Sequence, residues 1–162
     1  MLRADTVRVL SFPALLLLLG GCAGMSQQAC LSSDWRTVGF EAGHSGAVYQ
    51  GVCPKNLEPE FLANYNSGRR LYEFESAVRN IDAQIASNNY EQERIRGELT
   101  SIAAAMISKD TKPEDRVLMV SRSAELGRRY GELTNATQSL TAERAVKDRE
   151  LHDYQQTMSA RL

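Results

Sequence analysis

Cysteine, histidine, proline and aromatic residues are all scarce in this chain of 162 residues. There are three cysteines, two histidines, four prolines and one tryptophan, and 7% of the residues are aromatic. So few histidines and cysteines leave little material for a metal site, and we expect neither a metal nor a cofactor. A formal net charge of −1 lacks the basic excess of nucleic-acid-binding proteins, so we expect no nucleic-acid partner. The abundance of Ala, Leu, Glu, Gln and Arg predicts long helices and an all-α fold.

Residues 1–21 have the pattern of a signal peptide. Two arginines lie near the start, and the mostly apolar run Val9–Leu19 follows. This run is too short for a membrane span, which needs about 17–25 residues. The small residues Gly20 and Gly21 then lead directly to Cys22. We therefore expect the mature chain to begin at Cys22, with residues 1–21 removed.

The segment Leu19–Cys22 resembles the bacterial lipobox, whose common form is Leu-Ala/Ser-Gly/Ala-Cys. The resemblance implies that the Cys22 thiol takes a diacylglycerol and that its new amine is acylated, with palmitate as a typical chain. Two or three acyl chains anchor a protein firmly, whereas one chain binds only marginally. Ala23, where an aspartate would favour the inner membrane, favours the periplasmic face of the outer membrane. The alternative is an ordinary signal peptide that is cleaved near Ala23.

Cys30 and Cys53 are the cysteines that lipidation of Cys22 leaves. Because the periplasm is oxidising, we expect a disulfide between them. The chain-entropy model values a loop of this length at roughly 3 kcal/mol. Two free buried thiols are the alternative, and a metal pair with His44 lacks the usual ligand spacing.

One short stretch combines an acid, a tryptophan and three glycines: Asp34, Trp35, Gly39, Gly43 and Gly46. Asp34 suits the N-cap of a short helix. Gly39 and Gly43 lie four residues apart on one helical face, together with Trp35. Because glycine is unfavourable inside a helix, this spacing predicts the close approach of another backbone. Gly46 predicts the end of the helix.

These residues resemble the Cys…Asp-Trp-x-x-x-Gly-x-x-Asp-Gly-x-x-Gly box of small proteobacterial lipoproteins, the family called "domain of unknown function 2799". In this chain the box begins at Cys30, and Tyr65 and Gly68 stand where the family has Tyr-x-x-Gly. The family continues to a Tyr-Cys pair, whereas this chain has Arg69–Glu73 there and lacks that cysteine. The resemblance covers about Cys30 to Tyr72. It implies no activity, because none is established for the family.

The rest of the chain has two series of residues at alternating spacings of three and four, a heptad pattern typical of coiled coils. Pro59 suits the first turn of the helix that leads into them, and Gly68 is a candidate break. We call the two series seams. The first seam is Leu71, Phe74, Val78, Ile81, Ile85, Asn88, Gln92, Ile95, Leu99, Ile102 and Met106; the second is Met119, Ser123, Leu126, Tyr130, Leu133, Thr137, Leu140, Arg144, Lys147, Leu151, Tyr154 and Met158.

A polar segment near 108–113 separates the seams and predicts an antiparallel helical hairpin. In the register that centres on this turn, Ile95 faces Tyr130 and Asn88 faces Thr137, which gives one polar layer that fixes the register. Arg144 and Lys147 are the weak positions of the second seam. They either extend their alkyl stems across it or mark a surface where another molecule docks.

We therefore expect three parts: the signal peptide at 1–21, a small disulfide-linked helical module at 22–72, and an antiparallel coiled-coil hairpin at 73–162. The leading functional hypothesis is a non-enzymatic lipoprotein whose hairpin binds another envelope protein or associates with itself.

One alternative is a small-ligand or envelope-stress sensor with a groove lined by Trp35, Glu41 and His44. A periplasmic hydrolase is a weaker alternative. It would need a nucleophile beside His44 or His152, and no such motif is recognisable in the sequence.

Overall fold

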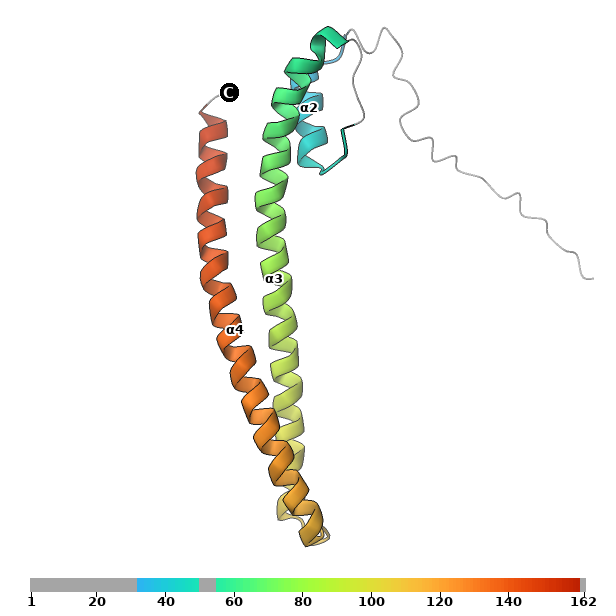
Figure 1. Ribbon diagram of the computed structural model, residues 1–162, viewed down its shortest axis with the longest axis vertical. Helices are drawn as coiled ribbons and strands as arrows, with labels where there is room; N and C mark the ends of the chain where they lie inside the picture. The colour runs from blue at the N-terminus through green and yellow to red at the C-terminus, as the bar shows by residue number, and fades with distance from the viewer. Residues whose placement is uncertain (1–31, 50–54, 161–162) are drawn as a thin grey trace, which may run out of the picture. The chain divides into compact units, whose positions relative to one another are not determined.

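The computed structural model describes residues 32–49 and 55–160. Its elements are the helix α2 (Trp35–His44), the short 3-10 helix η1 (Lys55–Leu57), and the long helices α3 (Glu58–Ile107) and α4 (Pro113–Ser159) (Figure 1). These two ranges contain no strand, so the predicted all-α class is confirmed. The predictions for the signal peptide and for Cys22, Cys30 and Cys53 lie outside the described residues.

Helix α3 is the central element of the unit that begins at Asp34. Pro59 lies in its first turn, where a missing N–H removes no helical hydrogen bond, and Glu58 and Glu60 complement the positive end of the helix dipole. The helix continues through Gly68, so a break at that residue was a wrong expectation. Its 50 residues span about 75 Å.

Helix α4 runs back along α3 in the opposite direction (Figure 1). Near the turn, Arg122 donates to the Glu98 carboxylate, and near the other end the Tyr154 hydroxyl donates to the Ser67 carbonyl. In the segment that connects the two helices, the Thr111 hydroxyl donates to the Ala105 carbonyl at the end of α3.

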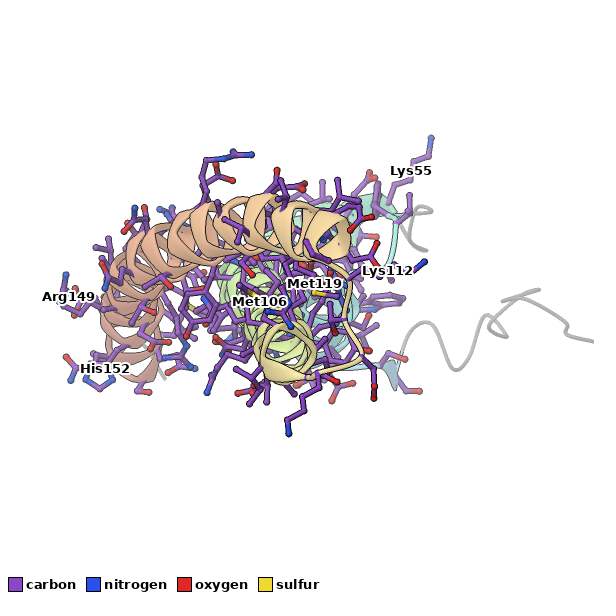
Figure 2. All side chains as sticks on the ribbon, turned by 90° about the horizontal axis from the view of Figure 1, so that it is seen from below. Lys55, Met106, Lys112, Met119, Arg149 and His152 are labelled. Atoms are coloured by element: carbon purple, nitrogen blue, oxygen red, sulfur yellow. The ribbon has the colours of Figure 1, made fainter. Side chains whose placement is uncertain are left out.

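Every position of the two seams is buried or half-buried. The packing is densest around Ile95, which is 0% exposed and lies in one cluster with Leu126 and Leu133. Tyr130, the residue expected opposite Ile95, packs against the same cluster. Figure 2 shows the Arg149 side chain pointing outward from the helix pair.

Helix α2 packs only on the first part of α3. No helix in residues 32–49 or 55–160 is long and apolar enough to cross a membrane.

Candidate functional site

Three glycines allow α2 and α3 to approach to backbone contact. A Cβ atom at Gly39 would lie 2.5 Å from the Phe61 carbonyl oxygen, and one at Gly43 would lie 2.6 Å from a backbone nitrogen of α3. Gly68 supplies the matching surface, since its Cβ would lie 2.8 Å from the His44 nitrogen. The close approach expected from Gly39 and Gly43 is therefore present, and Gly68 is a contact residue.

The Asp34 carboxylate caps the N-terminus of α2. It accepts hydrogen bonds from the Arg36 backbone nitrogen at 3.1 Å and from the Thr37 hydroxyl at 2.7 Å. These bonds, that from Thr37 first, lower the pKa of the Asp34 carboxyl below its usual value because they favour the charged form. The helix therefore begins at Trp35, with its side chain directed at α3.

Trp35 belongs to a packed aromatic cluster. The side chain is buried, and its ring meets the Phe61 ring edge-on at 6.1 Å between centroids. Phe61 stacks on Tyr65 at 5.9 Å, and Tyr49 packs against both rings. The Trp35 side chain therefore fills the contact between α2 and α3. Glu41, by contrast, is exposed.

The end of α2 is held by contacts between the segment that follows it and side chains of α3. Gly46 adopts a φ of +75°, and a Cβ there would lie 2.7 Å from the Tyr72 ring. The Arg69 guanidinium donates to the Gly46 carbonyl at 2.9 Å. The Tyr65 hydroxyl donates to the Ala47 carbonyl at 2.7 Å. Tyr65 of the family-like box therefore fastens the chain that follows α2.

The two histidines have simple partners. His44 Nε2 lies 3.1 Å from a Glu75 carboxylate oxygen, and His152 Nε2 lies 2.9 Å from the Gln156 side-chain nitrogen. Neither of these two contacts involves a serine hydroxyl. Within the same ranges, no group of three or more His, Cys, Asp or Glu residues could hold a metal ion.

The two weak positions of the second seam are charged groups with local partners. Arg144 donates to the Asp82 carboxylate across the helix pair at 2.6 Å, and it also contacts Asp148. Lys147 donates to Glu150 at 2.9 Å. These carboxylates raise the pKa of both cationic groups, with Asp82 contributing most to Arg144. Both side chains therefore end in ion pairs at the edge of the seam.

The polar layer expected from Asn88 and Thr137 contains a hydroxyl group without a hydrogen-bond partner. Asn88 and Thr137 are both half-buried, but the Thr137 hydroxyl is buried without a hydrogen-bond partner. Gln92, a further polar residue of the first seam, is buried as well. The seam thus contains one buried hydroxyl group without a hydrogen-bond partner. It lowers the free energy of unfolding, because the group loses its hydration on folding.

A shallow open cleft of about 470 Å³ lies between α3 and the end of α4. The Arg70 guanidinium lies 5.7 Å from the Phe74 ring centroid and 5.6 Å from that of Tyr154. Since Tyr154 also bonds the Ser67 carbonyl, these contacts fasten the last turns of α4 to α3.

Comparison with known proteins identified no relative of this chain. No family model, no curated protein and no solved structure matches it. The functional argument accordingly depends on the residues and contacts described above.

Proposed function

We propose that this protein is a lipid-anchored, non-catalytic lipoprotein of the periplasmic face of the outer membrane. The observation that carries the proposal is the lipobox-like segment Leu19–Cys22 at the end of a short apolar run. In this proposal the acylated Cys22 inserts in the bilayer, and the helical part beyond Asp34 serves as a structural or protein-interaction module of the envelope. The resemblance of the segment from Cys30 to Tyr72 to small proteobacterial lipoproteins agrees with the proposed lipid anchor and implies no activity.

The architecture supports an interaction role because two long helices that pack along one seam leave a large exposed area. Helices α3 and α4 each bury one seam, and most of their other side chains are exposed. Two open clefts, of about 470 Å³ and 350 Å³, lie on the helix pair, and neither is lined by a histidine or by the Trp35 cluster. A pair of long helices presents extended faces, which suit the binding of another helix better than the enclosure of a small substrate.

We further propose that the hairpin is an antiparallel coiled coil and that Cys30 and Cys53 form a disulfide. The disulfide can be tested by thiol alkylation and mass spectrometry of the mature protein. Neither cysteine should react until a reductant is added. Full labelling of both cysteines without reductant would show two free thiols instead.

The anchor is tested by fractionating cells that express the wild-type chain or the Cys22→Ser variant. We expect the wild-type protein in the outer-membrane fraction and the variant either soluble in the periplasm or uncleaved. Ala23→Asp provides a second arm, because it keeps the acylated cysteine and should move the protein to the inner membrane. If Cys22→Ser stays in the outer-membrane fraction, the anchor lies elsewhere.

A further inference from the structure

Helix α4 carries a second face that no described element covers. Like the seam beside it, this face repeats at alternating spacings of three and four, but none of its residues is charged. We call it the uncharged face. It consists of Val117, Val120, Ala124, Gly127, Gly131, Thr134, Gln138, Thr141 and Ala145, all of them exposed except Thr134, which is half-buried.

The packing of a single chain does not explain this face. Val117 is 70% exposed and Val120 is 54% exposed. A Cβ atom at Gly127 or at Gly131 would have no neighbour within 4 Å. Neither glycine relieves a contact within the chain, so the pair leaves room on this face for the close approach of a neighbour from outside it.

Helix α3 has a corresponding flank on the same side of the hairpin. Arg96 places its guanidinium 5.9 Å from the Tyr130 ring centroid, and Asp82 bonds Arg144, so both residues border α4 on this side. We call this series the α3 flank. Its exposed members are Arg79, Asp82, Ala86, Asn89, Glu93, Arg96, Thr100, Ala103 and Ile107.

Helix α2 already covers the beginning of the same flank. Counting back by the same spacings leads to Glu75, Tyr72, Gly68 and Phe61, and each of these contacts α2 or the segment that follows it. The cover ends at Glu75, so the flank is free from Arg79 onward.

The uncharged face of α4 has the same extent as this free part of the flank. Arg144, one residue before the end of the face at Ala145, bonds Asp82 near the start of the free flank. At the other end, Val117 lies beside the turn, as does Ile107, which is 85% exposed. A helix that covered the free flank would continue the layer that α2 begins.

We propose that this helix is α4 of a second copy of the same chain, in a parallel dimer whose two-fold axis runs along the hairpins. The uncharged face of each α4 then packs on the α3 flank of the other copy as far as Ala145, which gives a four-helix arrangement over that length. The turns of α4 beyond Ala145 leave the flank, because α2 of the other copy covers it before Arg79. The inference rests on the proposed interaction role and names its partner, but it does not depend on the lipid anchor.

The parallel orientation follows from which side chains meet. With both turns at one end, Val117 faces Ile107 of the second copy and Val120 faces its Ala103, so apolar residues meet apolar residues. Further along, the space above Gly127 and Gly131 accommodates the long ion-paired side chains of Glu93 and Arg96. In an antiparallel dimer the apolar residues at the turn would instead lie against polar residues from the middle of the hairpin.

The contact area agrees with a specific dimer. From Val117 to Ala145 the uncharged face is about 42 Å long. Helices that pack 8–10 Å apart share a strip of roughly that width. The two-fold axis creates two such strips, or roughly 800 Å² per copy, which is the size of a standard protein interface.

The first test is sedimentation of the full chain carrying Cys22→Ser, which excludes association through lipid. We expect a dimer at micromolar concentration. Gly131→Glu should weaken the dimer more than tenfold without loss of helix content, because the space around Gly131 is open in one chain. Ser139→Glu, at an exposed position outside the uncharged face, is the matched control and should leave the dimer intact.

The second test is cysteine cross-linking between two differently tagged chains in the same background. A mixture of Thr100→Cys and Ala124→Cys chains should form a covalent heterodimer, because these positions meet across the parallel interface. Ser101→Cys mixed with Glu125→Cys is the control, since each site lies one residue away on another face. Cross-links through the native cysteines would occur equally in both mixtures.

Three results would overturn the proposal: a monomer at tens of micromolar, equal cross-linking in both mixtures, or preferential cross-linking of Ala124→Cys with Thr134→Cys, which marks an antiparallel dimer. The proposed anchor is judged separately, by where the wild-type protein fractionates. Loss of the dimer and loss of the anchor are therefore distinct outcomes.

Discussion

The two contacts that α3 makes are built on opposite principles. Against α2 it meets backbone with backbone, through glycines whose missing side chains create the space. Against α4 it meets side chain with side chain, through a seam centred on Ile95, and the glycines of that region, such as Gly97, have open space around them. The difference shows that a glycine in a helix acquires its role from its neighbour, so identical residues in α3 should respond oppositely to the same substitution.

The seam side of this comparison is tested most strongly by Ile95→Ala. Ile95 is fully buried, so its truncation should lower the free energy of unfolding by about 2–5 kcal/mol through lost burial and a residual cavity. Urea denaturation of the Cys22→Ser chain measures this change. Leu118→Ala, at an exposed position outside the seam, is the control, and an equal loss there would contradict the seam.

The backbone side is tested by adding one methyl group at Gly68. A Cβ there meets backbone atoms of α2 that no side-chain rotation can move, so Gly68→Ala should lower the free energy of unfolding by about 1–3 kcal/mol. The matched variant is Gly97→Ala in the same helix, where the new methyl group meets nothing. It should raise stability by up to about 1 kcal/mol. Thermal melting of both variants gives the sign of each effect, and a shared sign would refute the contrast.

The uncompensated hydroxyl of the seam gives a smaller effect with a defined sign. Thr137→Val removes a buried hydroxyl that has no partner, so it should raise the free energy of unfolding by about 1 kcal/mol. Thr134→Val is the control, because the Thr134 hydroxyl donates to the Tyr130 carbonyl at 2.9 Å and its removal offers no such gain. If Thr137→Val instead lowers the free energy of unfolding, the Thr137 hydroxyl of the wild-type protein has a hydrogen-bond partner in solution.

The smallest expected effect is the pH dependence of the α2 cap. The pKa of Asp34 is lowered in the folded chain, so its contribution is fully present above its unfolded value and is lost as the pH falls through the folded value. The Asp34→Asn variant keeps a capping side chain but does not titrate. We therefore expect the melting temperatures of wild type and variant to differ more at pH 6 than at pH 3. A difference that is independent of pH would show that the charge of Asp34 contributes nothing.

The sequence predicted the seam better than the crossing of α2 and α3. The heptad spacing of mainly apolar residues marks one face of each long helix, and apolar residues on one face are buried together, so the seam residues could be listed in advance. Gly39 and Gly43 indicated a close approach, but Gly68 remained a candidate break or kink, because an isolated helical glycine has the same local pattern in a break and in a close contact.

Other features were absent from the prediction for different reasons. The bond from Arg69 to Gly46 joins residues that only the folded crossing brings together, and no spacing in the sequence signals it. The uncharged face of α4 did leave a signal, the absence of charge at every third or fourth residue from Val117 to Ala145. A pattern of large apolar residues does not mark this face, because most of its residues are Gly, Ala, Thr or Gln.

Because one uninterrupted helix contacts both of its neighbours, mechanical load enters this protein unevenly. In the proposed anchored state, the bilayer holds the chain at Cys22, and the proposed Cys30–Cys53 disulfide carries a pull on the hairpin past α2, which lies within the disulfide loop. Once that disulfide is reduced, the pull passes through α2, and the bonds that fasten its end, from Arg69 to Gly46 and from Tyr65 to Ala47, lie on the path. Under tension α2 should then separate from α3 first while α3 and α4 stay paired, so the glycine contact would act as an extensible joint in the reduced protein alone.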